Sequence, residues 1–368
     1  MLLTFTWDAP IGIDLGVYFV RYYQLFFLIA FIAGFRIMTQ IFRREQVDEK
    51  YLDTLLVVMI VATILGARLG HVFFYSWDYY QNNIAEIFMP WKGGLASHGA
   101  AIAIPLSILW FYRRYGRKEM GKSFLWLMDR IIITVALAGC LIRLGNFANS
   151  EIYGVAANSS VETVYLQPAR QHIDRYYSAY IDDLKFEPNG QVDTGGCDVT
   201  LYGYTMTIIP SQEIAAMSHD EADYNMNRLV SNSLRPTLND LDEDQRNVVI
   251  AEDAALRPIE AQGQRAYELN VLGIPRHPSQ IYEASAYLLI FLIVGWLYLR
   301  GYGSREGLMF GVFLIGVFGF RFFIEFLKAD QEAFEANMSL NMGQWLSIPL
   351  VLIGMWLIIR SIKSNTPS

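Results

Sequence analysis

Residues 131–154 read IIITVALAGCLIRLGNFANSEIYG. The stretch begins as an apolar run of the kind that crosses a membrane, and it ends with Arg143, Asn146, Asn149, Glu151 and Gly154. Charged and carboxamide side chains are costly at membrane depth, and those found there usually have a function. We therefore expect a functional site where this span ends.

The composition predicts an all-α integral membrane protein with seven transmembrane helices and an enlarged extracytoplasmic head domain. The 368 residues are 53% hydrophobic, yet one long stretch in the middle is polar. Apolar runs of about 20 residues place the spans near residues 17–38, 52–75, 96–115, 123–146, 279–300, 306–328 and 343–361. The expected divisions are residues 1–154 with spans one to four, 155–275 with the head insertion, and 276–368 with spans five to seven.

Basic residues in alternate connections predict the orientation. They follow the first, third, fifth and last spans, for example at Arg43, Arg113, Arg300 and Arg360, and they are almost absent from the other connections. The positive-inside bias then places the N-terminus outside and the C-terminus in the cytoplasm. No basic n-region precedes the first span, so no cleavable signal peptide is expected.

The head insertion is acidic and explains the formal net charge of −7. We interpret this charge as a solvated face rather than an acidic recognition surface, and nothing in the head indicates a nucleic-acid site. Residues 213–229 and 240–260 are predicted helical, and residues 188–190 and 195–196 are predicted loops. Cys140 and Cys197 are far apart in topology, and no histidine lies at metal-ligand spacing, so neither a disulfide nor a metal site is expected.

Arg143 is the strongest candidate for binding an anion. Its planar guanidinium suits a phosphate or carboxylate and stays charged at any working pH. On a continuing helix, Asn146 and Asn149 lie near the same face. The alternative is a structural network that fixes the head to the helices.

A second cluster occupies the sixth span, where Arg321, Glu325 and Lys328 share one helical stripe. It is either an ordinary intrahelical ion pair or a second guanidinium for the same anion. His98 opens the third span beside small residues. It is a candidate base or hydrogen-bond donor, with a purely structural histidine as the alternative.

Two further stretches extend the pattern. Residues 66–70, GARLG, combine small residues for close helix contact with Arg68, for which we expect an interhelical salt bridge. Residues 277–283, HPSQIYE, form a well-built helix start with Pro278 in the first turn and Glu283 near the positive end of the helix dipole. With residues 98, 143–154 and 321, these residues at the start of the fifth span are predicted to meet at the extracytoplasmic end, where a pocket carrying arginines suits an anionic phospholipid head group.

The stretch from Arg143 to Gly154 resembles the signature of the prolipoprotein diacylglyceryl transferase family. Supporting similarities are residues 66–70, GGLASHG at 93–99, HPSQIYE at 277–283 and RFFIEFLK at 321–328, and the sequence from Tyr23 resembles the family's Tyr-Gly-Leu. The resemblance covers all the expected spans. It does not cover most of residues 155–270, because this insertion is longer than the family's usual head.

The chain departs from the family at four positions. Ile142 replaces a usual glycine, Ala100 a second glycine after the histidine, and Lys328 a usual arginine, while Val317 stands where tyrosine is frequent. None of these is a residue that the resemblance makes indispensable, although Val317 could alter how the lipid is held.

The resemblance implies a reaction and its partners. A diacylglyceryl group passes from phosphatidylglycerol to the lipobox cysteine thiol of a prolipoprotein signal peptide, which forms a thioether and releases glycerol 1-phosphate. The expected location is the bacterial cytoplasmic (inner) membrane, with the lipid bilayer as surroundings. No metal and no organic cofactor are implied.

The resemblance also implies residue roles. Arg143 and Arg321 would bind and stabilise the departing phosphate, and His98 would accept the thiol proton. Glu151 or the field of the arginines remain alternatives for the proton. The substrate-binding residues would be Tyr23, Asn146, Asn149, Glu151, Gly154, His277, Tyr282 and Glu325, with Glu325 orienting Arg321.

Two rival functions use the same residues differently. A transporter or channel for a small anion would also place arginines in glycine-broken spans, but the polar residues cluster at one face and the halves show no inverted repeat. A sensor with an acidic head would explain the insertion but gives no use for arginines in two separate spans.

Overall fold

The structure is a computed structural model that describes residues 3–16, 19–89, 91, 93–94, 96–159, 161–194, 199–261, 263–328 and 339–363. The chain forms two compact units. The first comprises Met1–Phe27, Cys140–Ala286 and Gly319–Ile348, and the second comprises Leu28–Gly139, Tyr287–Phe318 and Pro349–Ser368.

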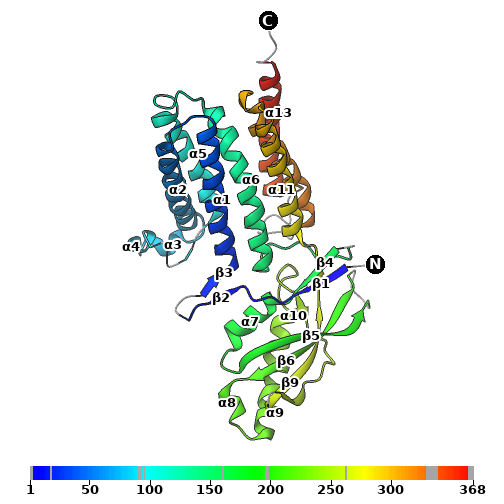
Figure 1. Cartoon of the computed structure of the whole chain (residues 1–368). Helices are drawn as coiled ribbons and strands as arrows, with labels where there is room; N and C mark the ends of the chain where they lie inside the picture. Colours follow the sequence, from blue (N-terminus) through cyan, green and yellow to red (C-terminus); the bar gives the residue numbers. More distant parts are fainter. Residues whose placement is uncertain are drawn as a thin grey trace. The chain divides into compact units, whose positions relative to one another are not determined.

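Six helices in the described residues are long and apolar enough to cross a membrane (Figure 1). They are α1 Tyr22–Arg44, α2 Lys50–Phe74, α6 Phe124–Ala148, α11 Ser279–Leu299, α12 Leu308–Ile324 with a 3-10 turn to Leu327, and α13 Met342–Lys363. These helices fit an integral membrane protein and coincide with six of the predicted spans. The first begins later than expected, because a short hairpin of β2 Gly12–Asp14 and β3 Phe19–Arg21 precedes it.

The remaining predicted span, 96–115, is not one of these six helices. Its residues form α5 Ser97–Phe111, which has 15 residues and continues into a π-helical turn, Tyr112–Gly116. In the second unit α5 packs on α2 through glycines. A Cβ added to Gly99 would lie 1.9 Å from the carbonyl oxygen of Gly66, and one added to Gly70 would lie 2.7 Å from the Cα of Gly99. The predicted close helix contact at residues 66–70 is confirmed.

The expected interhelical salt bridge of Arg68 was wrong. The buried guanidinium donates to the carbonyl oxygens of Glu86, Ile87, Gly93 and Gly94 instead of pairing with a carboxylate. Both glycines have positive φ, which turns their carbonyls toward the arginine at little steric cost. Arg68 therefore fixes the segment that contains α3 Trp77–Tyr80 and α4 Ile84–Ile87.

A buried carboxylate anchors α12 at its start. Asp129, with no exposed surface, accepts hydrogen bonds from the backbone nitrogens of Gly307 (2.7 Å) and Phe310 (2.8 Å). These nitrogens have no partner within the helix, and the helix dipole favours a negative charge there. The neighbouring Arg130 pairs with Glu45 at 3.0 Å. The buried charges of Asp129 and Arg130 therefore both have partners.

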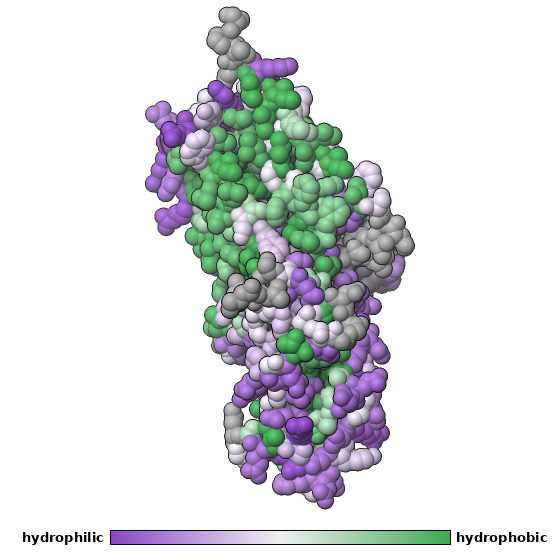
Figure 2. Space-filling model, turned by 90° about the vertical axis from the view of Figure 1, so that its right-hand side faces the viewer, coloured by the Kyte–Doolittle hydropathy of each residue, from purple (hydrophilic) through white to green (hydrophobic). Residues whose placement is uncertain are grey.

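The outer surfaces of the long helices are apolar. Along α11, Leu289, Leu292 and Trp296 are each more than half exposed. Figure 2 shows hydrophobic side chains over the helices, whereas the surface of the head is mostly hydrophilic. Exposed apolar faces of this length fit contact with lipid.

The chain is not all-α, which corrects the predicted fold class. The head contains a five-stranded antiparallel sheet in the order β5-β6-β9-β7, with β8 also paired to β9. A second sheet has the order β1-β4-β10. The strands are β1 Leu3–Trp7, β4 Val161–Tyr165, β5 Ile181–Asp193, β6 Leu201–Pro210, β7 Val248–Val249, β8 Arg257–Ala261, β9 Gln264–Gly273 and β10 Pro275–Arg276.

Alternation along the strands builds the core of the head. Met206 and Ile208 on β6 and Leu269 and Val271 on β9 are buried on one face, where helices cover them (Figure 1). Period-two burial of this kind is the mark of a sheet with one solvated face. The helices are α7 Gln167–Tyr177, α8 Gln212–Ala215, α9 His219–Leu229 and α10 Arg235–Asn239, with a π-helical turn at Val230–Leu234.

Only part of the predicted head structure is confirmed. Residues 213–229 contain α9 and all of α8 except its first residue, as expected. Residues 240–260 were predicted helical, but they contain β7 and the start of β8, because alternating burial at Val248–Ile250 favours a strand and Pro258 disfavours a helix. Residues 188–190 lie within β5 at an irregularity and not in a loop, while residues 195–196 and Cys197 lie outside the described residues.

Candidate active site

Three segments of the first unit meet at Gly154. Its nitrogen donates to the carbonyl oxygen of His277 (2.9 Å), and it forms an antiparallel bridge with Lys328. The nitrogen of Val155 donates to the oxygen of Leu327 (3.0 Å), and that of His277 donates to Val155 (3.2 Å). The exit of α6, the start of α11 and the end of α12 are thereby tied together by backbone.

Replacing Gly154 by alanine should reduce activity by about 100-fold, the effect of displacing catalytic groups by roughly 1 Å. A Cβ there would lie 2.4 Å from the oxygen of Leu327 and 2.7 Å from the Cβ of His277, so the segments must separate. The turnover of purified protein would be compared with that of Gly295→Ala, a helical position with nothing within 4 Å of the added atom. Normal turnover of both variants would contradict the close-approach argument.

Five side chains of alternating charge form a continuous chain across these segments. Arg143 Nε lies 3.1 Å from Glu283 Oε2, and Lys328 Nζ lies 3.1 Å from Glu283 Oε1. Lys328 Nζ is also 3.5 Å from Glu325 Oε1, which is 3.3 Å from Arg321 Nε. We call Arg143, Glu283, Lys328, Glu325 and Arg321 the charge chain. With all five groups ionised, it has one net positive charge.

The geometry leaves the two arginines free to bind an anion. Glu283 is fully buried and Lys328 is 3% exposed, so the middle of the charge chain is inaccessible, whereas Arg321 is 39% exposed. Glu283 Oε2 and Glu325 Oε1 lie close to the guanidinium groups, but neither accepts a well-aligned hydrogen bond from the residues that the structure describes. Within the described part of the chain, several N–H donors at Arg143 and Arg321 thus remain available for an anionic oxygen.

The other polar residues of the signature gather around Arg143. Its Nη1 donates to Asn146 Oδ1 (3.4 Å). Asn149 accepts from the nitrogen of Tyr23 (3.4 Å) and donates to Glu151 Oε1 (3.3 Å). Glu151 lies 3.7 Å from Arg21 Nη1, which gives this carboxylate a basic partner.

The backbone around Glu151 is held in an uncommon conformation. Ser150 and Ile152 both have positive φ, which is costly for a β-branched residue. The start of α11 holds the segment, since Gln280 donates to the oxygen of Glu151 (2.8 Å) and Ser279 to that of Ile152 (3.0 Å). Conformations of this kind persist only where surrounding contacts impose them, and they concentrate at functional sites.

His277 faces Tyr282. The Tyr282 hydroxyl lies 3.2 Å from the carbonyl oxygen of Val161 and 3.4 Å from His277 Nδ1. Burial lowers the pKa of His277 below its usual value, although the carboxylate of Glu162 opposes this shift.

Acidification should destabilise the folded protein through His277. Below about pH 6.5 the unfolded chain binds a proton that the folded protein resists, so the free energy of unfolding falls with pH. We expect the drop in unfolding temperature between pH 7.5 and pH 5.5 to be smaller in His277→Gln than in wild type. The control is His219→Gln at the exposed start of α9. A wild-type drop unchanged by His277→Gln would exclude this residue as its source.

His98 is the one predicted site residue that belongs to the second unit. It is the second residue of α5, and its side chain lies outside the described ones. The other predicted residues all lie in the first unit and include both arginines. Within the residues that the structure describes, no three histidine, cysteine, aspartate or glutamate side chains gather to hold a metal ion.

Three charged residues form ion pairs in the site that the sequence did not predict. Glu283 was interpreted only through the helix dipole, yet it joins Arg143 to Lys328. Lys328 was placed on the stripe with Glu325 but given no function, and Arg21 was not among the predicted site residues. Spacing along one helix predicts i,i+4 partners, but it gives no signal for partners on other helices.

The comparison with protein families agrees with this geometry. The family model described as prolipoprotein diacylglyceryl transferase matches residues 10–360. The chain belongs to this family. The resemblance first suggested by Arg143–Gly154 is therefore confirmed over nearly the whole chain.

Relatives of similar length carry the family's activity in their names. The phosphatidylglycerol–prolipoprotein diacylglyceryl transferase of Tolumonas auensis is 30% identical and covers 98% of both chains. The enzyme of that name from Porphyromonas gingivalis is 32% identical over 98% of this chain and 95% of its own, and that from Chloroherpeton thalassium is 31% identical over 97% and 94%. The enlarged head is thus matched within these full-length alignments.

Proposed function

We propose that this protein transfers the diacylglyceryl group of phosphatidylglycerol to the lipobox cysteine thiol of a prolipoprotein, the first step of lipoprotein maturation. The observation that carries the proposal is the charge chain at the exit of α6. It occurs in a protein that belongs to the transferase family. Its single net positive charge matches the single negative charge of a phosphodiester.

The reaction forms one bond and breaks one. The thiolate sulfur attacks the glycerol carbon that bears the phosphate, a carbon–sulfur bond forms, and the carbon–oxygen bond breaks with its electron pair on the departing phosphate. Glycerol 1-phosphate leaves, and the thiol proton passes to an acceptor. Arg143 and Arg321 bind the phosphate and stabilise the negative charge that develops on it.

The remaining site residues hold the arginines and the lipid in place. Glu283 and Glu325 orient the guanidinium groups. Lys328 pairs with both of these carboxylates where they are shielded from solvent. The glycerol head group of the lipid lies next to four side chains, those of Tyr23, Asn146, Asn149 and Glu151. His277, Tyr282 and Gly154 form the adjoining wall.

His98 is our proposed acceptor of the thiol proton. A histidine with a pKa near 6.5 is neutral at working pH, and a thiol near 8.5 is within reach of it. Glu151 is less suited, because its carboxylate is shared with Asn149 and Arg21. Loss of transfer in His98→Gln, with the pH dependence of Glu151→Gln unchanged, supports this assignment.

We place the protein in the bacterial cytoplasmic membrane with its site on the extracytoplasmic side. The N-terminus faces outward and the C-terminus inward, as the basic connections indicate. The third predicted span, residues 96–115, crosses the membrane as α5 together with its π-helical turn, which lengthens a helix of 15 residues. A reporter that is active only in the cytoplasm, fused after Lys363, should be active. An inactive fusion would contradict a cytoplasmic C-terminus.

The function is tested with purified protein, phosphatidylglycerol micelles and a lipobox peptide. Mass spectrometry should show a diacylglyceryl thioether on cysteine, and glycerol phosphate should be released in equal amount. A peptide with serine in place of cysteine is the control. Folded protein that binds the lipid but yields neither product would favour a transporter or sensor.

A further inference from the structure

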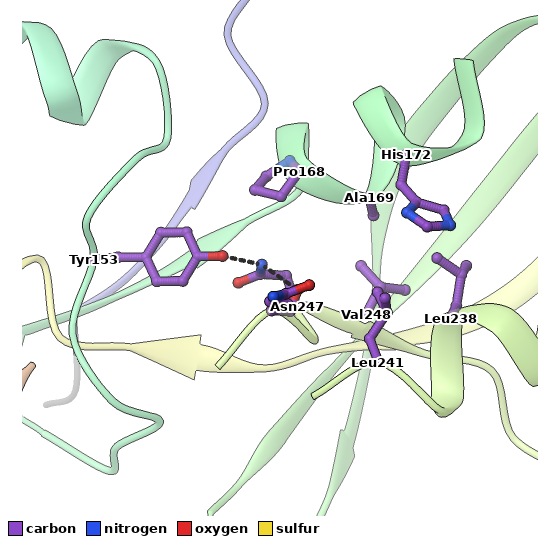
Figure 3. A pocket seen from close by; sticks show the side chains of 9 residues that line it. Tyr153, Pro168, Ala169, His172, Leu238, Leu241, Asn247 and Val248 are labelled. Atoms are coloured by element: carbon purple, nitrogen blue, oxygen red, sulfur yellow. Dashed lines mark hydrogen bonds between the residues drawn. The ribbon is translucent and has the colours of Figure 1, made fainter. Parts of the chain in front are cut away.

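The head of the first unit contains a half-open cavity of about 220 Å³ next to the active-site backbone (Figure 3). One side of the cavity is apolar. It is formed by Ala169 of α7, Leu238 of α10, Val248 of β7, and Leu241 from the segment between α10 and β7. Ala169, Leu238 and Val248 are buried, so these walls are fixed by the core of the head. The volume is below the roughly 300 Å³ at which pockets for drug-sized ligands begin.

Polar groups complete the lining. His172 Nε2 is buried and has no hydrogen-bond partner among the described residues. Burial and the nearby Arg175 lower the pKa of His172, so its ring is neutral near pH 7 and can donate or accept one hydrogen bond. Gln245 is exposed, and the buried Asn247 donates from Nδ2 to the carbonyl oxygen of Gln245 (3.1 Å). No lysine or arginine is among the described residues of the lining, which disfavours an anionic lipid head group.

The cavity and the active site are built on the same backbone. Tyr153 lines the cavity and directly precedes Gly154. Its hydroxyl accepts a hydrogen bond from Asn247 Nδ2 (2.6 Å), and Asn247 Oδ1 accepts one from Arg276 Nε (3.0 Å). Arg276 stacks on Tyr153 at 5.1 Å and directly precedes His277. The cavity therefore adjoins the backbone at Gly154 and His277, which belongs to the proposed site.

We propose that this cavity binds one apolar side chain of the prolipoprotein on the carboxyl side of the acceptor cysteine. The inference rests on the proposed function, which requires a polypeptide acceptor whose residues after the cysteine lie in water. The apolar wall accommodates a single aliphatic or aromatic side chain, and His172 binds a backbone group beside it. Specificity for the acceptor then depends partly on residues beyond the lipobox.

The test uses the full-length enzyme with phosphatidylglycerol and two kinds of lipobox peptide. The short peptide ends just after the cysteine. The long peptides add eight polar residues, with one leucine moved through the eight positions in turn. Leucine at one or two positions should lower KM by about tenfold, as expected for burying one aliphatic side chain, and should leave kcat unchanged.

A cavity-filling variant makes the test specific. Ala169→Leu should abolish the gain from leucine while leaving KM for the short peptide unchanged. The control is Ala216→Leu, an exposed alanine after α8 in the same head. If Ala169→Leu lowers the turnover of all peptides alike, the KM values of the wild-type enzyme for the leucine series decide whether the cavity assignment holds.

The outcomes separate this inference from the proposed function. Wild type that modifies every peptide with the same KM, wherever leucine stands, would overturn the cavity assignment and leave the transferase intact. A gain from leucine that survives in Ala169→Leu would overturn it as well. Wild type that modifies no peptide at all would instead contradict the proposed function.

Discussion

Replacing Arg143 by alanine should slow thioether formation by about 100-fold or more, the usual effect of removing a group that stabilises developing negative charge. The guanidinium lies beside Glu283 and Asn146 with the side chain 16% exposed, and the described contacts leave donors for a phosphate oxygen. Arg143→Lys keeps the charge but loses the planar fork, so an intermediate rate is expected. Rates would be measured with saturating peptide and varied phosphatidylglycerol.

The control for Arg143 is Arg265→Ala in the head. Arg265 pairs with Asp223 at 2.6 Å on the surface of the head sheet, and it should be dispensable for transfer. Near-normal rates in Arg143→Ala, with the folded fraction unchanged, would rule out phosphate binding by this residue.

Replacing Lys328 by methionine should destabilise the protein by about 3–5 kcal/mol, the cost of leaving a buried charge without its partner. Glu283 has no exposed surface and Glu325 little, and both depend on the Lys328 ammonium. Their displacement would also misplace Arg143 and Arg321, so activity should fall even in the fraction that remains folded. Lys328→Arg keeps the charge and should retain most activity.

An exposed ion pair provides the matched control. Lys50 and Asp48 are 3.0 Å apart, but both side chains are more than half exposed. Lys50→Met should therefore cost less than about 1 kcal/mol. Unfolding in detergent would be followed for all three variants. Equal stability of Lys328→Met and Lys50→Met would show that the charge chain does not hold the site together.

The apolar framework could be predicted from the sequence because hydropathy acts locally. A span needs a run of apolar residues wherever its partners lie, so the α2, α6, α11 and α13 boundaries agree with the prediction to within about two residues, as expected of helix assignments. The head was harder. Its strands β6 and β9 carry alternating burial that the sequence reading did not use, and residues 240–260 were charged enough to resemble a helix.

The site was predictable where its contacts are local. The i,i+4 spacing of Arg321 and Glu325 predicts their ion pair, and Asn146 lies one turn from Arg143. Contacts between segments were not predictable. Glu283 joins Arg143 only because α6 and α11 are tied at Gly154, and Arg68 finds carbonyl oxygens because two glycines turn them inward.

The central claim is that Arg143 and Arg321 act on one phosphate. A double-mutant cycle tests it by comparing kcat/KM for wild type, Arg143→Gln, Arg321→Gln and the double variant. Two groups that stabilise the same charge are coupled, so the double variant should be little slower than the slower single variant. Losses that simply multiply would show that the two arginines act independently and would contradict the shared phosphate site.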